Sequence, residues 1–201
     1  MKRLKYEPTL PCHRILEQAC EVLAKGGIIV YPTDTIYGLG CSIFSEQAVR
    51  RVYKIKGRDS RNPMSIICSG LEDISKFATV PNFAFRLMKR SLPGPYTFIL
   101  ESSKEVPKYI RSTKKTVGIR VPDHTLCLAL VKKFGHPIIT TSVNISGEAP
   151  LNEPDIVEDS FEKDIDLLVD SGMLTTGPST VVDCSKGSPE ILRHGEGDLG
   201  I

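Results

Sequence analysis

The sequence predicts an α/β protein in which helices flank a twisted mixed sheet. Apolar segments of strand length alternate along the chain with segments whose apolar residues recur every three or four positions, the helical period. Glycine and proline separate the two kinds of segment. A chain of 201 residues can bury one sizeable core, and we find no repeat, low-complexity tract or linker. We therefore expect a single domain over residues 1–201.

The first half of the chain opens with a helix. Apolar residues keep the helical period over 15–23, and Gly26-Gly27 ends the helix. A buried strand over 28–31 follows and ends at Pro32. The other elements expected in this half are helices over 46–56, 71–78 and 82–91 and a strand over 64–68.

The second half is richer in strands. Pro93-Gly94-Pro95 forces a turn before a strand over 96–100. Further strands are expected over 116–121, 137–141, 167–169, 180–183 and 191–193, with helices over 126–134 and 155–163. Residues 148–154 are the best candidate for a flexible surface loop.

Composition narrows the class of protein. Hydrophobic residues make up 40% of the chain and charged residues 25%, which is typical of a soluble globular protein. The net charge of +2 makes no case for nucleic acid. Residues 50–61 nevertheless hold six basic residues and one acid, whereas residues 148–170 hold nine acids and one lysine. The basic run indicates an anion-attracting region, although for Arg50 and Arg51 a solvated helix face explains it equally well.

Cysteine and histidine usage excludes several kinds of site. The six cysteines form no CxxC pair, which indicates a reducing compartment with neither a disulfide framework nor a zinc site. The four histidines show no metal-ligand spacing, so we expect no protein-bound metal. No apolar leader or membrane span is visible. We therefore expect a cytoplasmic protein without a membrane partner.

Familiar nucleotide-binding and hydrolase motifs are missing from the sequence. It contains no GxxxxGK[ST], HExxH or GxSxG. A formal GxGxxG occurs at Gly195, Gly197 and Gly200, but a single residue follows it, so no helix can open there.

The segment 32–40 follows a buried strand and is rich in threonine and glycine. The hydroxyls of Thr33 and Thr35 can bond a small zwitterion, and Gly38 and Gly40 allow close approach of the backbone. The alternative is a glycine-rich turn with an Asx-type hydrogen bond from Asp34.

Lys56-Gly57-Arg58 lies at the end of a predicted helix. Together with Arg61 and Asn62 it forms a dense cluster of donors, of the kind that transfer of a triphosphate requires. The alternative is that these cations only complement the helix dipole.

Two later strands also carry polar side chains. Alternation puts Thr116, Gly118 and Arg120 on one side of a strand, where a rigidly aimed Arg120 suits a carboxylate and can donate two parallel hydrogen bonds to it. Ser142 and Asn144 follow an apolar strand and can donate to phosphate or ribose oxygens. The same reasoning covers Ser179 and Arg193. A surface arginine and a polar turn are the respective alternatives.

The ordered set of motifs resembles the YrdC-like family, the threonylcarbamoyl-AMP synthases. The resemblance covers residues 26–197, and the stretch 82–107 is similar to the YciO-like branch. The motifs that carry it are PTDT–YGLG at 32–40, KxR at 56–58, Asn62-Pro63 before a strand, TVGIRVP at 116–122, SxN at 142–144 and STVVD at 179–183.

This resemblance implies a fold, an activity and partners. The fold is a YrdC-like twisted mixed sheet with a positively charged concave surface. The activity joins L-threonine, bicarbonate and ATP into threonylcarbamoyl-AMP and pyrophosphate, for the threonylcarbamoyladenosine modification of tRNA. A partnership with the threonylcarbamoyl-transferase complex follows from the same resemblance, as does Mg²⁺ held mainly by the nucleotide.

The resemblance also assigns roles to residues. Lys56 and Arg58 would be catalytic. L-Threonine would be held by Thr35, Arg120, Thr140 and Ser179, with Arg120 on the carboxylate. ATP would be held by Arg58, Asn62, Thr116, Ser142, Asn144 and Arg193.

Three features depart from the family pattern. Asp59 follows the KxR element, where proline is frequent, and Ile67 stands where some members carry a histidine that reaches threonine. The chain also stops near residue 201, so we expect it to lack the extra C-terminal domain of longer members.

Two other functions stay open. The first is a double-stranded RNA or tRNA-binding protein of the same fold, supported by the basic run 50–61 and by four more basic residues over 108–115. Against it, only 6% of residues are aromatic and none is tryptophan, so stacking on single-stranded bases is not expected. The second is carbamoyl-adenylate chemistry with another acceptor, against which the chain lacks acylphosphatase-like and zinc-finger segments.

Overall fold

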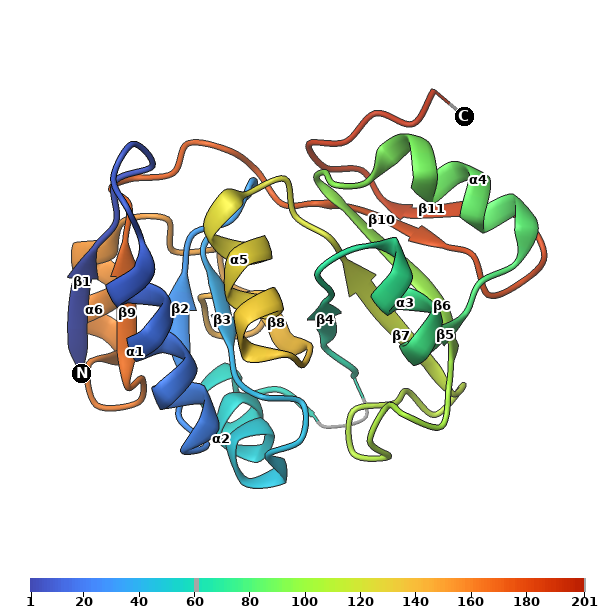
Figure 1. Cartoon of the computed structure of the whole chain (residues 1–201). Helices are drawn as coiled ribbons and strands as arrows, with labels where there is room; N and C mark the ends of the chain where they lie inside the picture. Colours follow the sequence, from blue (N-terminus) through green and yellow to red (C-terminus); the bar gives the residue numbers. More distant parts are fainter. Residues whose placement is uncertain (60–61, 201) are drawn as a thin grey trace.

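One mixed sheet runs the length of the molecule (Figure 1). The computed structural model describes residues 1–59 and 62–200. Within them, ten strands follow the order β1-β9-β2-β3-β8-β4-β7-β6-β10-β11, and β5 pairs with β6. The bounds are β1 Lys2–Lys5, β2 Ile29–Tyr31, β3 Gly38–Gly40, β4 Ser65–Ile67, β5 Ala78–Thr79, β6 Tyr96–Ser102, β7 Thr116–Arg120, β8 Ile138–Ser142, β9 Leu167–Asp170, β10 Thr180–Asp183 and β11 Glu190–Arg193. The expected twisted mixed sheet is confirmed.

Every helix that the sequence predicts is present, and no end differs from the predicted one by more than two residues. The helices are α1 His13–Ala24, α2 Glu46–Lys56, α3 Leu71–Phe77, α4 Asn82–Ser91, α5 Thr125–Phe134 and α6 Pro154–Phe161. Helix α2 ends at Gly57, whose φ of 55° is left-handed, as a glycine at this position permits. Residues 148–153 precede α6 and form no regular element.

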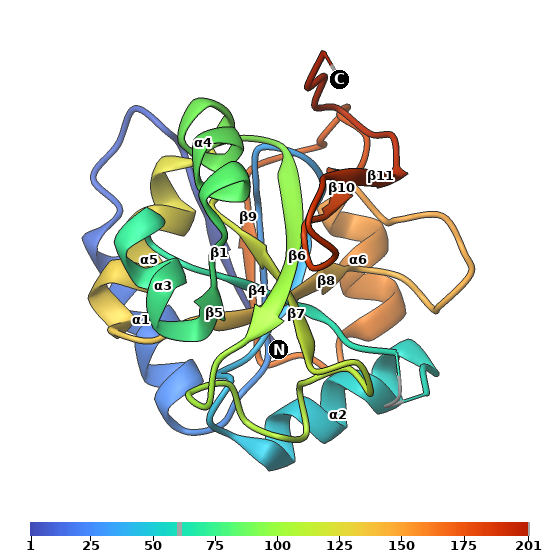
Figure 2. The same ribbon diagram turned by 90° about the vertical axis from the view of Figure 1, so that its right-hand side faces the viewer.

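Helices cover both faces of the sheet. In β2, Ile29 and Tyr31 belong to a core cluster with α1 and α5, whereas Val30 belongs to a larger cluster that includes α2 and α6. Figure 2 shows α1 and α5 on one side of the strands and α6 on the other. The alternation of strand residues therefore divides the apolar core into two layers.

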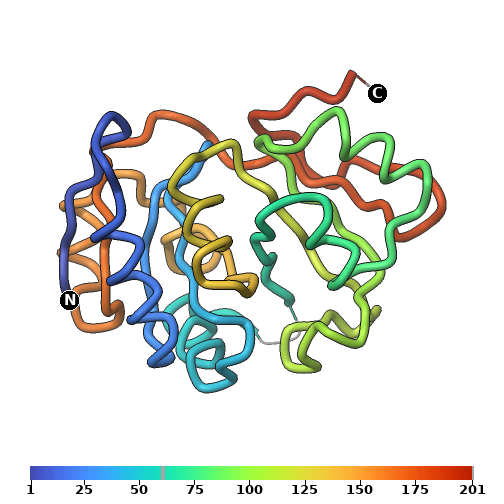
Figure 3. The backbone as a smooth tube through the Cα atoms, in the orientation of Figure 1, coloured from blue at the N-terminus to red at the C-terminus, as the bar shows by residue number. Residues whose placement is uncertain are grey.

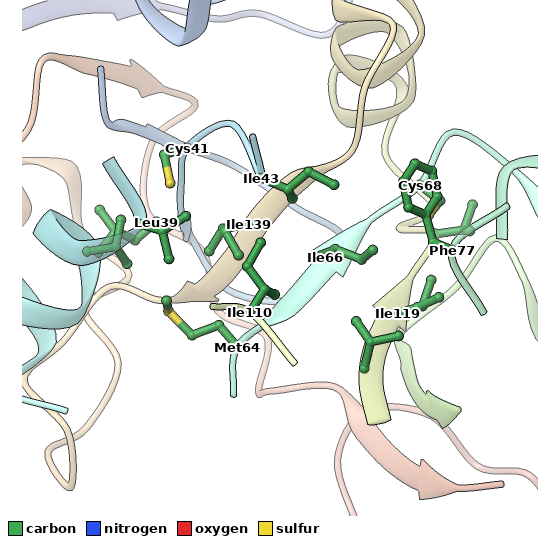
Figure 4. Packing of buried hydrophobic residues seen from close by; sticks show 14 of the residues in the cluster. Leu39, Cys41, Ile43, Met64, Ile66, Cys68, Phe77, Ile110, Ile119 and Ile139 are labelled. Carbon is green, nitrogen blue, oxygen red and sulfur yellow. The ribbon is translucent and has the colours of Figure 1, made fainter. Parts of the chain in front are cut away.

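The larger cluster is centred on β4. Ile66 pairs in register with Ile119 of β7 and Ile139 of β8, and all three are fully buried. Figure 4 shows them in one cluster, with Leu39 on the side of Ile139 and Phe77 on the side of Ile119. Burial of one such side chain is worth about 1.5–3 kcal/mol, so this cluster fixes the central strands.

Three short strands were not predicted, and one of them bears on an alternative considered above. A glycine-rich turn was the alternative for the segment 32–40, but within it Gly38–Gly40 forms β3 between β2 and β8. A Cβ on Gly38 would lie 2.8 Å from the ring of Tyr31, and one on Gly40 would lie 2.9 Å from it. Both glycines are therefore needed to admit this buried ring. The other two missed strands are β1 and β5.

The connection from β9 to β10 crosses from one end of the sheet to the other, because β9 is second in the strand order and β10 is ninth. Figure 3 shows this segment and places the N- and C-termini at opposite ends of the molecule. On its way it contacts the segment after β2, where the Thr176 hydroxyl donates to the carbonyl of Thr35. It thereby places Ser179 immediately before β10, next to β6.

Candidate active site

Most of the predicted site residues line a cavity of about 490 Å³. It lies on the side of β6, β7 and β10 opposite to the larger core cluster, because its lining residues alternate with members of that cluster. Three arginines from distant parts of the chain line it, Arg58, Arg120 and Arg193. The other predicted residues that line it are Thr116, Thr140, Ser142, Asn144 and Ser179.

Arg120 is buried at the end of β7, with 6% of its surface exposed. As predicted, Val117 and Ile119 point into the core, while Thr116, Gly118 and Arg120 line the cavity. The Arg120 Nη2 donates to Asp34 Oδ1 and to Thr35 Oγ1, each at 2.9 Å. Its strand aims the guanidinium, and a buried carboxylate pairs with it.

Asp34 and Thr35 do not have the places that we expected. Asp34 Oδ1 accepts from Arg120 and Oδ2 accepts the backbone N–H of Asp123, so these are the bonds its carboxylate forms rather than the Asx turn considered above. Thr35 is fully buried behind Arg120 and is not among the described residues that line the cavity.

Lys56 is buried, although it sits in the last turn of α2. Its Nζ donates to the carbonyl of Ser142 at 2.7 Å, to Ser142 Oγ at 3.3 Å and to Asn144 Oδ1. Burial, with a smaller contribution from the neighbouring Arg58 charge, lowers the pKa of Lys56 to about 8. Lys56 therefore lies behind Ser142 and Asn144, which line the cavity in its place.

The predicted donor cluster is only partly assembled. Arg58 lines the cavity, and its Nη2 donates to the carbonyl of Pro63 at 3.2 Å. Asn62 is exposed and is not among the described lining residues; its carbonyl accepts the hydroxyl of Tyr53. Arg61 lies outside the described residues.

Ser179 and Arg193 meet on the far wall of the cavity. Arg193 Nη2 donates to the carbonyl of Ser179 at 2.8 Å, and Ser179 Oγ lies 2.8 Å from Thr97 Oγ1. Burial, together with repulsion from Arg120, lowers the pKa of Arg193. Sequence reasoning missed Thr97, but alternation along the predicted strand 96–100 carried the signal, since Thr97 and Ile99 share the cavity side.

Two other lining residues, Ser65 and Glu148, have no clear signal in the local sequence. Ser65 lines the cavity beside Gly118, where an added Cβ would lie 2.5 Å from Ser65 Oγ. Glu148 is the one carboxylate among the described lining residues.

Ile67 is not among the described lining residues. It stands where some family members carry a histidine, and it is buried in the apolar cluster under α5.

The described residues offer no preformed metal centre. They contain no group of three or more His, Cys, Asp or Glu side chains able to hold a metal ion. All six cysteines are free, and burial raises the pKa of Cys41 to about 12. None of the helices that the structure describes combines the length and apolar composition needed to cross a membrane.

Comparison with known proteins places this chain in a family. A family profile named Sua5_yciO_yrdC and described as "Telomere recombination" matches residues 21–195. The Escherichia coli (strain K12) protein YciO, named as uncharacterized, is 39% identical over 194 residues, which cover 96% of this chain and 94% of that protein. Its crystal structure matches with a TM-score of 0.94 at 38% identity, over 99% of this chain and 98% of that one.

A threonylcarbamoyl-AMP synthase is similar as well. The Pyrococcus abyssi enzyme is 36% identical over 180 residues, which cover 88% of this chain and 53% of that one. The crystal structure of P. abyssi Sua5 complexed with L-threonine matches with a TM-score of 0.88 at 33% identity, over 96% of this chain and 57% of that chain. The resemblance that the motifs indicated is thereby confirmed, and the chain belongs to the Sua5/YrdC/YciO family.

Proposed function

We propose that this protein is an L-threonylcarbamoyladenylate synthase, a nucleotidyltransferase that acts on L-threonine, bicarbonate and ATP. The observation that carries the proposal is the cavity, in which three arginines and a group of hydroxyls surround about 490 Å³. An amino acid carboxylate and a triphosphate are both anions that such a cavity attracts. The similarity to an enzyme whose structure holds L-threonine supports the choice of amino acid.

The reaction needs positioning and charge stabilisation more than proton transfer. The threonine amine and bicarbonate give a carbamate and water. A carbamate oxygen then attacks the α-phosphorus of ATP, and the bond from that phosphorus to pyrophosphate breaks. Because the attacking oxygen is already anionic, the cavity has to hold the reactants in line and stabilise the charge that moves to pyrophosphate.

The roles proposed for the arginines follow from their surroundings. Arg120, which pairs with Asp34 inside the protein, receives the threonine carboxylate, with Thr140 and Ser179 nearby. Arg58 lines the same cavity as Ser142 and Asn144 and binds the phosphates with them. Lys56 holds Ser142 and Asn144 in place on the cavity wall through its hydrogen bonds to both residues.

Magnesium would enter with the nucleotide. Magnesium is usually held by one or two carboxylates together with phosphate oxygens and water, rather than by a cage made only of protein ligands. The described lining residues supply a single carboxylate, Glu148. The ion would therefore be held mainly by the nucleotide, and we assign no step to it.

The direct test is release of pyrophosphate by the purified protein with ATP, magnesium and bicarbonate, with and without L-threonine. Separation of the nucleotides by chromatography should show a new adenylate peak only when threonine is present. Pyrophosphate release without dependence on threonine, in protein that binds ATP, would contradict the proposal.

Two variants test the assignment of the arginines. Arg58→Ala should weaken ATP binding and Arg120→Ala should weaken threonine binding, each by about 2–4 kcal/mol, the range for loss of one partner of a buried charged pair. Calorimetric titration with each substrate separates the two effects. If both variants turned over normally, the site would be assigned to the wrong residues even though the family is right.

A second candidate is binding of double-stranded RNA or tRNA, favoured by a hollow between α2 and the segment before β7. Arg50, Lys108 and Arg111 line it with Tyr53 and Tyr109. Phosphate-driven binding should fall steeply with salt, with a slope near the number of phosphates neutralised. A flat salt dependence, or no binding at low salt, would exclude it.

A further inference from the structure

The guanidinium of Arg120 is already paired with a carboxylate of the protein itself. A terminal guanidinium nitrogen carries two hydrogens, and those of Nη2 go to Asp34 Oδ1 and Thr35 Oγ1. The side chains of Arg120 and Asp34 are 7% and 9% exposed, so the ion pair is shielded from water. It joins residues 86 positions apart in the sequence.

Asp34 is itself fixed in place. It follows β2, and its second oxygen accepts the backbone N–H of Asp123 at 3.0 Å, just beyond the end of β7. Strands β2 and β7 are not neighbours, since β3, β8 and β4 lie between them. The carboxylate therefore holds two distant strand ends in a fixed relation, and Arg120 is bound to one of its oxygens.

One buried donor of Arg120 has no acceptor in the part of the chain that the structure describes. Its Nε is buried and has no hydrogen-bond partner among the described residues. A buried N–H without an acceptor is unfavourable, and an incoming acceptor removes that penalty. Both bidentate forks of a guanidinium include Nη2, which is occupied, so the expected pair of parallel bonds would require Asp34 or Thr35 to share it.

We propose that Asp34 is a positioning residue that holds Arg120 by Nη2 and so presents the buried Nε–H to the carboxylate of the amino acid substrate. The identity of that ligand rests on the proposed function, whereas the positioning of Arg120 does not. Asp34 touches neither the substrate nor the reacting atoms, because it acts through Arg120.

Charge and position predict opposite effects of removing Asp34. If Asp34 only competed for Arg120, its neutralisation would make the cavity more positive, and a carboxylate would bind more tightly. If Asp34 positions Arg120, neutralisation releases the guanidinium and a carboxylate binds more weakly. An asparagine cannot replace it, because the amide has one acceptor oxygen and must serve both Arg120 and the N–H of Asp123.

The experiment compares Asp34→Asn with Asp123→Asn, which removes the same charge from an exposed neighbouring side chain. Calorimetric titration with L-threonine should show at least about tenfold weaker binding for Asp34→Asn, the effect of losing one charged hydrogen bond. Asp123→Asn should stay within about twofold. Unchanged or tighter binding by Asp34→Asn would overturn the proposal.

A second measurement needs neither substrate nor turnover. In ¹H–¹⁵N spectra of the wild-type protein, the Nε–H of Arg120, assigned by its loss in Arg120→Lys, should be resolved and protected from solvent exchange. Asp34→Asn should remove that protection. If the wild-type signal behaves so but L-threonine fails to shift it, the proposed substrate is wrong and the positioning role stands.

A last NMR measurement uses the wild-type protein alone, in case Asp34→Asn does not fold. An Nη2 held by two acceptors slows rotation about the Nε–Cζ bond, so the Nη1 and Nη2 signals of Arg120 should be distinct. Merged signals at room temperature would show a freely rotating guanidinium and would overturn the proposal.

Discussion

Replacement of Lys56 by methionine should separate the function of this buried cation from its effect on stability. A pKa of about 8, against 10.5 for a free lysine, means that the fold holds the ammonium less favourably than water does. Since one pKa unit is worth about 1.4 kcal/mol, the difference is on the order of 3 kcal/mol. Methionine has a similar length, fills the same space and escapes this cost.

The loss on the other side is larger. The ammonium donates to the Ser142 carbonyl, the Ser142 hydroxyl and the Asn144 amide oxygen, and bonds to charged donors contribute about 1.5–3 kcal/mol each, or about 4.5–9 kcal/mol for three. Asn144 Oδ1 keeps a second donor, the hydroxyl of Ser142, at 2.6 Å. Set against the gain of about 3 kcal/mol, Lys56→Met should lower the free energy of unfolding by roughly 1.5–6 kcal/mol.

The substitution should weaken ligand binding as well. Without their common donor, Ser142 and Asn144 are no longer held together at the cavity wall, and ATP should bind about 10–100-fold more weakly. Lys54→Met is the matched control, because it removes an exposed cation from the same helical turn. Wild-type ATP affinity in Lys56→Met, measured by calorimetry alongside urea unfolding, would refute this reasoning.

The pH dependence of ATP affinity and of stability provides a second test of this prediction. A neutral lysine has two N–H groups and cannot serve three acceptors, so wild-type ATP affinity should fall as pH rises through about 8, and Lys56→Met should lack that fall. Between about 8 and 10.5 the unfolded chain binds the proton and the folded one does not. The stability that the wild type has relative to Lys56→Met should therefore rise with pH over the same range.

Two further predictions concern the fold. Gly40→Ala puts a Cβ 2.4 Å from a backbone carbonyl oxygen of β8 and should destabilise the fold by about 1–3 kcal/mol, which lowers Tm by about 2–4 °C per kcal/mol. Gly70→Ala is the control, because its Cβ would meet open space among the described residues, and it should not change Tm. Equal shifts in Tm would contradict the packing argument. Arg3→Met leaves the buried Asp170 without its guanidinium partner and should lower the free energy of unfolding, measured in urea, by about 1–3 kcal/mol. Arg50→Met breaks an exposed ion pair and should lower it by less than about 0.5 kcal/mol. Similar values would show that burial does not decide how much an ion pair contributes to stability.

Local periodicity was enough to predict most of the elements and part of the site. Alternation along β7 correctly put Arg120 on the polar side of its strand, and the hydroxyl-rich end of β8 correctly marked the cavity. Both signals lie within one element, because the side chains of a strand face its two sides in turn. A strand can therefore be oriented from its own sequence.

What could not be predicted depends on partners far away in the sequence. Strand β1 carries three basic residues in four positions and forms because it pairs in parallel with β9, more than a hundred residues later. Arg3 adds bonds to carboxylates of α6 and β9. Strand β3 consists of glycines around one leucine, a composition that argues against a strand until the ring of Tyr31 is placed on it.

The same limit applies to charge. From the sequence, Lys56 and Arg120 are two cations expected to bind anions. Nothing near them in the sequence shows that each is already bonded to acceptors from a distant part of the chain. Because a ligand must share or replace bonds that exist in the empty protein, each new contact adds less than its full strength. What a ligand gains is a cavity whose donors need no reorganisation, and that favours a transition state whose charge appears where those donors already point.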